Sequence, residues 1–147
     1  YDAKGLNAMP MNHGGVRTFD FGEVKYVNAI HTSSFSDGSY GGNPGGFVMS
    51  SEGKSIYIAG DTSLTMDMKL IPMYKKIDLA ILPIGDVLTM GVDDAIIASD
   101  FVECNRVLGV HYDAFPFTKI NKSDAVEAFK KAGKELELLE VGSSLTV

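Results

Sequence analysis

Three side chains that can bind a metal ion lie at the ends of predicted strands. They are His31, Asp61 and His111, and imidazole and carboxylate groups suit zinc, manganese or iron. Ligands of open α/β sheets bind at the carboxyl ends of strands, so these positions favour a shared metal site. The preceding strands are expected over 24–30, 55–59 and 106–110. A structural alternative stays open, in which both histidines are core residues and Asp61 caps the next helix, because the chain has no H-E-x-x-H motif.

The run that ends at Asp61 is the strongest of the three signals. Ile56, Tyr57 and Ile58 are β-branched or aromatic, which predicts a buried strand, and Gly60 ends it. A carboxylate at the end of a buried strand is costly unless hydrogen-bond donors, a cation or a metal offset its desolvation. Asp61 is therefore the residue around which a site is expected.

The other polar residues favour structural roles. His13 precedes two glycines and is interpreted as a loop residue, with contact to a substrate or metal as the alternative. The glycines over 41–46 lack the G-K-[ST] and G-x-G-x-x-G patterns of phosphate-binding loops, which favours turns. Asp86 either supports the site or caps a turn. Four sulfur-containing residues are expected to pack in the core: Cys104, Met66, Met68 and Met73.

The composition limits the classes of partner. The chain has 147 residues, of which 45% are hydrophobic, so it is long enough for one globular domain over 1–147. Its net charge of -6 disfavours nucleic acid as a partner, because phosphate binding needs clustered Lys and Arg. No apolar run reaches the about 20 residues of a membrane span, so no membrane partner is expected. The single cysteine suits a reducing compartment, which predicts a cytoplasmic protein.

The order of elements predicts an α/β fold (an α+β mixed sheet). Hairpin strands come first, and helices then alternate with strands, which predicts helices on one face of the sheet and a second face that needs a cover. Helices are expected over 64–74, 91–102 and 121–133, the first capped by Thr62-Ser63 and the last by Asn121. Strands are expected over 16–21, 24–30, 46–50, 55–59, 77–84, 106–110, 135–141 and 143–147.

The short motifs, taken in order, resemble the C-terminal half of metallo-β-lactamase-fold proteins. The nearest branch is one of metal-dependent hydrolases similar to L-ascorbate-6-phosphate lactonase. The resemblance implies half of an αβ/βα four-layer sandwich. The motifs that carry it are Gly14-Gly15, Phe19-Asp20-Phe21-Gly22, Ala29-Ile30-His31-Thr32-Ser33, Ala59-Gly60-Asp61-Thr62, Asp67-Met68-Lys69-Leu70, Leu82-Pro83-Ile84-Gly85-Asp86, Thr89-Met90-Gly91, Asp94-Ala95 and Gly109-Val110-His111-Tyr112-Asp113.

The resemblance also implies an activity and a site. His31 would complete a first metal site, Asp61 would bridge two metals, and His111 would complete the second, with Asp61 and His111 as the catalytic residues. The implied cofactor is two zinc ions, or manganese in some relatives. A metal-bound hydroxide would attack an ester, lactone, amide or phosphoester of a small-molecule substrate.

The chain departs from this family at the first metal motif. H-x-H-x-D-H should precede the matched region and is absent, so the active centre is expected to be incomplete. The chain alone is then expected to be inactive and to bind fewer ions, or none. Its expected partner is the missing N-terminal half or a second copy of the chain. The alternative function is a non-catalytic fragment or binding module that associates through the face its missing half would cover. Val87 and Leu88 stand where the family has other residues, which leaves the substrate contacts open.

Overall fold

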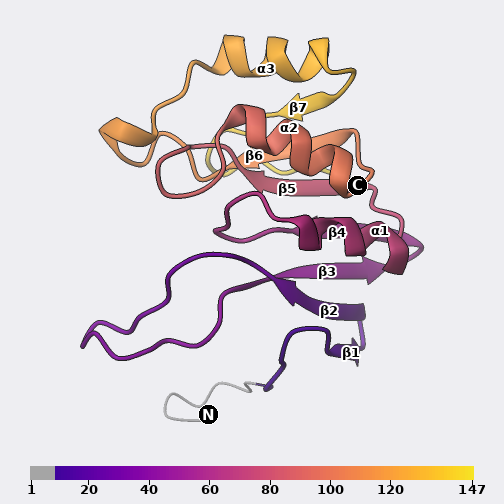
Figure 1. Cartoon of the computed structure of the whole chain (residues 1–147). Helices are drawn as coiled ribbons and strands as arrows, with labels where there is room; N and C mark the ends of the chain where they lie inside the picture. Colours follow the sequence, from indigo (N-terminus) through magenta and orange to yellow (C-terminus); the bar gives the residue numbers. More distant parts are fainter. Residues whose placement is uncertain (1–8) are drawn as a thin grey trace.

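A seven-stranded mixed sheet forms the frame of the molecule, and its strands lie side by side in chain order (Figure 1). The computed structural model describes residues 9–147. This arrangement confirms the expected α/β class with a mixed sheet. The strands are β1 Val16–Phe19, β2 Gly22–Asn28, β3 Gly45–Ser51, β4 Lys54–Ile58, β5 Leu79–Pro83, β6 Arg106–Val110 and β7 Glu135–Glu137.

Strands β1 to β4 form an antiparallel meander, and β4 to β7 are parallel to one another. The connection between two parallel strands is right-handed in nearly all proteins. Because β4 to β7 follow one another in the sheet in chain order, the helices that connect them all lie on the same face. Figure 1 shows α1 and α2 in front of the sheet, with α3 at its β7 end. The helical segments are η1 Met66–Leu70, α1 Ile71–Tyr74, α2 Val92–Phe101, η2 Pro116–Thr118 and α3 Lys122–Lys131, of which η1 and η2 are 3-10 helices. Within residues 9–147, none of the helices has the length and apolar composition that crossing a bilayer requires.

The hydrophobic core lies between the sheet and these helices. Alternate residues of the central strands point into it, because successive side chains of a strand face opposite sides of the sheet. The largest fully buried side chains of this core are Val48, Tyr57, Leu82, Ile84, Val107, Met68, Met90, Val102 and Phe129. Cys104 is buried as expected.

The opposite face of the sheet carries no helix among the described residues. The cross-strand pairs Phe47–Ile58, Ile58–Ile81 and Ile81–Leu108 place apolar side chains next to one another on it. We call this surface the helix-free face. It is formed by partly exposed side chains of Phe47, Met49, Ile56, Ile58, Ile81 and Leu108.

The C-terminal segment crosses part of the helix-free face instead of forming the strand predicted over 143–147, so that prediction is wrong. A turn in which Ser143 N donates to Glu140 O, with Gly142 at φ +88°, redirects the chain after β7. The end of the chain then reaches back across the sheet, where Arg106 Nη2 donates to Thr146 O and Val147 borders Met49 and Ile56. The strand predicted over 135–141 is correspondingly shorter, because β7 ends at Glu137.

The helix predicted over 64–74 is present in a different form. It consists of η1 followed by the single turn α1, and its N-cap is Thr65, whose hydroxyl accepts a hydrogen bond from Asp67 N at 3.4 Å. The core role expected for Met66 and Met73 is wrong, since both are largely exposed on this segment, whereas Met68 is buried as expected. The predicted cap of α3 is confirmed, because Asn121 Oδ1 accepts from Ser123 N and Asp124 N.

Removing the hydroxyl of Tyr57 is expected to stabilise the protein. The Tyr57 ring is fully buried, burial raises the pKa of its hydroxyl, and that hydroxyl has no hydrogen-bond partner among the described residues. A buried donor without a partner is costly, so Tyr57→Phe should raise the free energy of unfolding by about 1 kcal/mol. Chemical denaturation measures the change, and a fall in stability would mean that this hydroxyl has a partner.

Tyr74→Phe is the matched control, because its hydroxyl donates to Glu23 Oε1 at 2.7 Å. Burial and this hydrogen bond raise the pKa of Tyr74 to about 12, while the bonds from Tyr74 and Lys75 lower the pKa of Glu23. The stabilisation by an ionised Glu23 is therefore present above the ordinary glutamate pKa and is lost as the pH falls through its lowered pKa. Tyr74→Phe should lower stability more at about pH 7 than at about pH 3.

Candidate functional site

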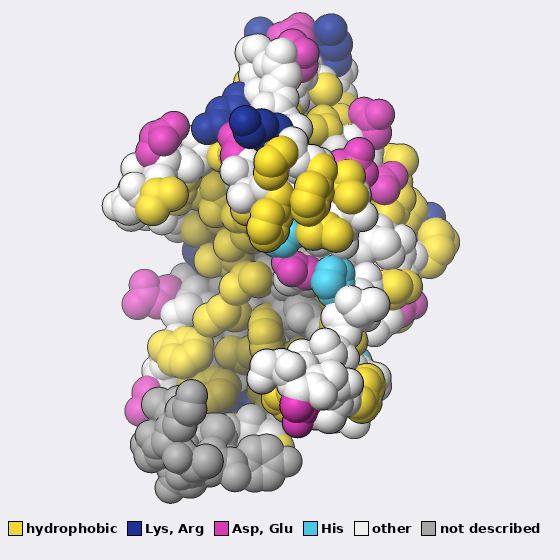
Figure 2. All heavy atoms as spheres, turned by 90° about the vertical axis from the view of Figure 1, so that its left-hand side faces the viewer, with side chains coloured by type: hydrophobic (Ala, Val, Ile, Leu, Met, Phe, Trp, Pro, Cys, Tyr) yellow, Lys and Arg dark blue, Asp and Glu magenta, His cyan; other side chains and the backbone are white. Residues whose placement is uncertain are grey.

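The carboxyl ends of four strands meet at one end of the sheet. Because β3 is antiparallel to both β2 and β4, strand β2 runs in the same direction as β4, β5 and β6. The segments after these strands carry His31, Asp61, Asp86 and His111, respectively. Figure 2 looks onto this end and shows two histidine side chains next to an acidic side chain near the middle of the surface.

Asp61 and His111 are brought into contact from segments that are far apart in the sequence. Their closest atoms, His111 Nε2 and Asp61 Oδ2, lie 3.4 Å apart, and the two side chains are 28% and 50% exposed. The other ring nitrogen, His111 Nδ1, is buried and has no hydrogen-bond partner among the described residues. We call these two residues the Asp61–His111 pair.

The segment that carries His31 lies beside the segment that carries Asp61. Ile30 N donates to Thr62 Oγ1 at 3.0 Å, and Ser63 N donates to Ile30 O at 3.1 Å. The residues that adjoin His31 and Asp61 are thus hydrogen-bonded to each other. The imidazole of His31 is directed to the backbone of the next residue, since Nδ1 lies 2.8 Å from Thr32 O. The segment of His31 is therefore next to that of Asp61, and Nδ1 of His31 is paired with the carbonyl of the adjacent residue.

Across residues 9–147, no three side chains of His, Cys, Asp or Glu gather closely enough to be recognised as a metal cluster. The described part of the chain thus presents two candidate ligands in contact and a third on the neighbouring segment. His13 has other contacts. Its ring stacks on Tyr26 with centroids 4.7 Å apart, and its Nε2 lies 2.8 Å from Pro44 O.

The Asp61–His111 pair fits a metal ion in both chemistry and spacing. Two ligands that each lie about 2.1 Å from one tetrahedral ion are separated by about 3.4 Å, which matches the observed nitrogen–oxygen distance. Carboxylate and imidazole are also the donor types that zinc and manganese accept.

Thr62 joins the segments around this pair, a role that the sequence analysis missed. Its side chain is fully buried. Its Oγ1 accepts from Ile30 N and donates to Ser63 O at 2.8 Å, and its carbonyl accepts from Met90 N at 3.1 Å. The expected role of Thr62 as a helix cap is wrong. Its hydroxyl is bonded to Ile30 N and Ser63 O, and the N-cap of η1 is Thr65. A hydroxyl directly after a site carboxylate was the only sequence signal for this role.

Replacing Thr62 with valine is expected to lower the free energy of unfolding by about 2 kcal/mol, because Ile30 N loses the acceptor that the buried Thr62 side chain supplies. Thr62→Ser keeps the hydroxyl and should recover most of this loss. Chemical denaturation of both variants makes the comparison. Equal losses would show that the methyl group of Thr62 matters rather than its hydrogen bonds.

The loop over 84–91, here the β5–α2 loop, packs against the backbone of His111. Ile84 N donates to Val110 O, and a Cβ on Gly85 would lie 2.1 Å from His111 O. Only glycine therefore fits at position 85 without displacing the backbone. Asp86, at φ +60°, supports a tight turn, since its Oδ1 accepts from Val87 N at 2.7 Å and its N donates to Met90 O. Of the two roles expected for Asp86, the structure shows the capping of a turn.

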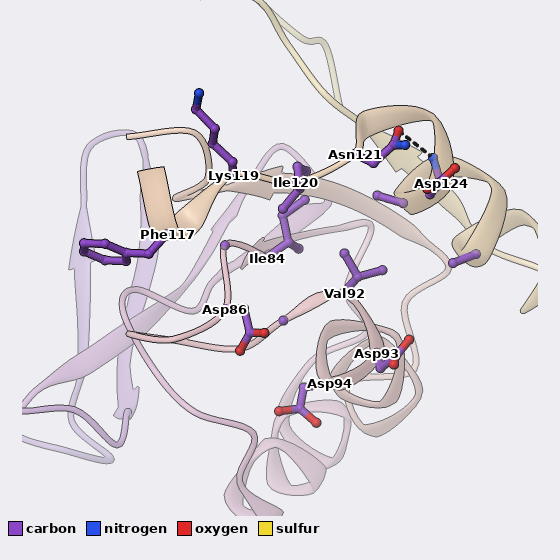
Figure 3. Close-up of a pocket in the computed structure, with 14 residues that line it drawn as sticks. Ile84, Asp86, Val92, Asp93, Asp94, Phe117, Lys119, Ile120, Asn121 and Asp124 are labelled. Atoms are coloured by element: carbon purple, nitrogen blue, oxygen red, sulfur yellow. Dashed lines mark hydrogen bonds between the residues drawn. The ribbon is translucent and has the colours of Figure 1, made fainter. Parts of the chain in front are cut away.

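A cavity of about 600 Å³ opens beside this loop, between the first turns of α2 and α3. In Figure 3, Asp86 and Phe117 lie on one side of it, and Asp93 and Asp94 extend from α2 on another. Asp124 and Lys119 complete its charged lining. Neither member of the Asp61–His111 pair lines this cavity, which adjoins their segments through Gly85 and Asp86.

Comparison with known proteins finds similar sequences over nearly the whole chain. A family profile described as "Beta-lactamase superfamily domain" matches residues 1–112. A protein of Christiangramia forsetii named UPF0173 metal-dependent hydrolase is 62% identical over 145 residues, which is 99% of this chain and 64% of that protein. The chain thus spans just under two thirds of the length of this relative.

Solved structures show the same arrangement of elements. Igni18, a metallo hydrolase of Ignicoccus hospitalis, matches 97% of this chain and 61% of its own with a TM-score of 0.83 and 28% identity. YhfI of Bacillus subtilis, a metallo-beta-lactamase fold protein, matches 90% of this chain and 53% of its own with a TM-score of 0.69. The identity to YhfI is 13%, so this second likeness concerns the fold alone.

Proposed function

This chain belongs to the beta-lactamase superfamily, and we propose that it supplies the Asp61–His111 part of the active site of a metal-dependent hydrolase. The observation that supports this proposal most directly is the 3.4 Å approach of His111 Nε2 to Asp61 Oδ2 at the carboxyl end of the sheet. The relative from Christiangramia forsetii is named a metal-dependent hydrolase, which supports the same class of reaction.

Within this proposal, Asp61 and His111 hold metal directly, and His31 joins them from the neighbouring segment. Zinc suits this donor set, and manganese is the alternative. When bound, such an ion polarises the bond that is to be cleaved and lowers the pKa of a water molecule. The carboxylate of Asp61 offsets the charge of the ion. The β5–α2 loop connects the segments of Asp61 and His111, because Met90 N donates to Thr62 O and Gly85 packs against the backbone of His111.

The net reaction is the addition of water across an acyl or phosphoryl bond. The water oxygen bonds to the carbonyl carbon or to phosphorus, and the bond to the leaving oxygen or nitrogen breaks. The leaving group departs with a proton. No further reactant is needed, so the proposal requires only substrate, water and the metal site.

The remaining metal ligands come, in this proposal, from the part of the protein outside this chain. The chain spans 64% of the relative from Christiangramia forsetii, and the resemblance assigns it to the C-terminal side of a four-layer sandwich. The helix-free face offers the place for the other layers, because its apolar side chains stay partly exposed. Figure 2 shows hydrophobic side chains along a hollowed side of the molecule, next to the histidines.

The test compares the 147-residue chain with a longer protein that also contains the part proposed to lie outside it. Metal content and calorimetric titration with Zn²⁺ and Mn²⁺ would be measured for both, together with hydrolysis of lactones, esters and phosphodiesters. The longer protein should bind two ions and hydrolyse at least one substrate class, and the shorter chain should do neither. Tight binding of two ions by the 147-residue monomer would contradict the shared site. A longer protein that binds no metal would contradict the hydrolase.

The helix-free face supports a second candidate function, that of a non-catalytic module which associates through this surface. Partly exposed apolar residues on adjacent strands favour association with a second copy or another chain. Analytical ultracentrifugation distinguishes this case. A dimer without metal or hydrolysis would support it, and a monomer at high concentration would contradict it.

A further inference from the structure

We propose that the substrate of the Asp61–His111 site carries an uncharged alkyl or aryl group, held by the β5–α2 loop and by the loop over 111–121, here the β6–α3 loop. The substrate class that fits such loops is an ester, lactone or amide of an apolar acid. This inference rests on the proposed hydrolase and names the substrate of that same site.

The β5–α2 loop holds apolar side chains out into solvent at a strained position. Val87 is 66% exposed and has φ +58°, a left-handed conformation that is unusual for a β-branched residue. Hydrogen bonds keep it there, because Leu88 N donates to Asp86 O at 2.6 Å and Met90 N to Thr62 O. Leu88 is also exposed. Backbone strain that the surrounding contacts enforce is a feature of binding sites.

The β6–α3 loop presents a second apolar element. Phe115 and Phe117 stack with ring centroids 5.3 Å apart and planes within 6°, and about half of each side chain is exposed. The buried Thr118 fixes this pair, because its Oγ1 accepts from Phe115 N and its carbonyl accepts from Asp113 N. The aromatic pair is therefore held in place rather than free to collapse onto the surface.

Both loops begin at the proposed site. The β5–α2 loop contacts the backbone of His111 through Gly85 and that of Thr62 through Met90, and the β6–α3 loop starts at His111 itself. Figure 2 shows hydrophobic side chains bordering the two histidines and the acidic side chain. Phe117 and Asp86 also line the same cavity, in which they lie on one side (Figure 3). An apolar group next to the cleaved bond would thus meet these side chains.

The charges around the loops disfavour a polyanionic substrate. Asp86, Asp93, Asp94 and Asp124 line the cavity beside the two loops, where Lys119 is the cation among the lining residues. The chain has a net charge of -6. The carboxylates of this cavity repel an anionic group held between the two loops, so an uncharged group is the favoured partner of the exposed side chains.

The test uses the longer, metal-loaded protein and a variant with Val87→Asn and Phe117→Ser. Asparagine tolerates the left-handed conformation, so the backbone of the loop should be kept. Wild-type protein should hydrolyse p-nitrophenyl hexanoate with a kcat/KM at least about 10-fold above that for the acetate, because each buried methylene adds to binding. The variant should lose this preference because its KM for the hexanoate rises. Its kcat/KM for the acetate should stay within about 2-fold of the wild-type value. Met73→Ser, at an exposed position on α1, is the control and should retain the preference.

Calorimetric binding of acetohydroxamate and hexanohydroxamate to the metal-loaded protein gives a readout without turnover. Tighter binding of the hexano compound that disappears in the variant supports the inference, even if neither ester is hydrolysed. Equal affinity of the two hydroxamates for wild type overturns it. The inference is also overturned if the variant changes the oligomeric state but keeps the preference for the hexano compound. The two loops would then contact another protein chain rather than the substrate. Absence of metal binding contradicts the proposed function instead, which separates the two failures.

Discussion

Asp61→Asn is expected to reduce metal-dependent hydrolysis by at least about 100-fold in the longer protein, because loss of a metal ligand removes the ion's contribution to the reaction. The substitution preserves the size of the side chain and removes the charge that lies 3.4 Å from His111 Nε2. A neutral amide is a weaker ligand for zinc or manganese and no longer offsets the charge of the ion. Calorimetric titration of metal and steady-state kinetics should therefore both show the loss.

Asp67→Asn is the matched control for this substitution. Asp67 lies on η1, where its Oδ2 accepts a hydrogen bond from Asn28 Nδ2, and it takes no part in the Asp61–His111 pair. Metal affinity and activity should stay close to wild type in this variant. Unchanged metal affinity and activity in Asp61→Asn would instead favour a binding module in which the histidines are structural.

Gly85→Ala is expected to destabilise the protein by about 3 kcal/mol and to displace the backbone of His111. The added Cβ would lie 2.1 Å from His111 O, 3.1 Å from His111 C and 3.2 Å from Tyr112 Cα. All three atoms belong to the backbone, so no side-chain rotation relieves the clash. Chemical denaturation should show the loss of stability, and metal titration should show weaker binding because His111 moves relative to Asp61.

Gly38→Ala separates this clash from the general effect of replacing a glycine. Gly38 has φ +83° in the long loop between β2 and β3, and a Cβ there would meet nothing within 4 Å. The cost is that of the left-handed backbone alone, about 1 kcal/mol, with metal binding unchanged. Equal effects of the two substitutions would show that the close approach of Gly85 to His111 is relieved at little cost.

Several elements of the fold followed from local patterns. The strand expected over 106–110 matches β6, and the Asn121 cap of α3 is where the residue types placed it. Capping and strand alternation act over a few residues, so a single sequence carries them. The strand expected over 143–147 failed because a strand also needs a neighbour. The turn near Gly142 sends the chain across the helix-free face, away from the outer edge of β7.

The sequence by itself determined that His31, Asp61 and His111 stand at strand ends, since short apolar runs and a chain-breaking glycine are local signals. The tertiary structure alone decided that Asp61 meets His111, because that contact depends on β4, β5 and β6 running parallel as neighbours in the sheet. It also decided that Thr62 joins two segments, through a hydrogen bond to Ile30 across 32 positions of the chain. Such contacts depend on the packing of distant segments, and no local pattern of residue types specifies them.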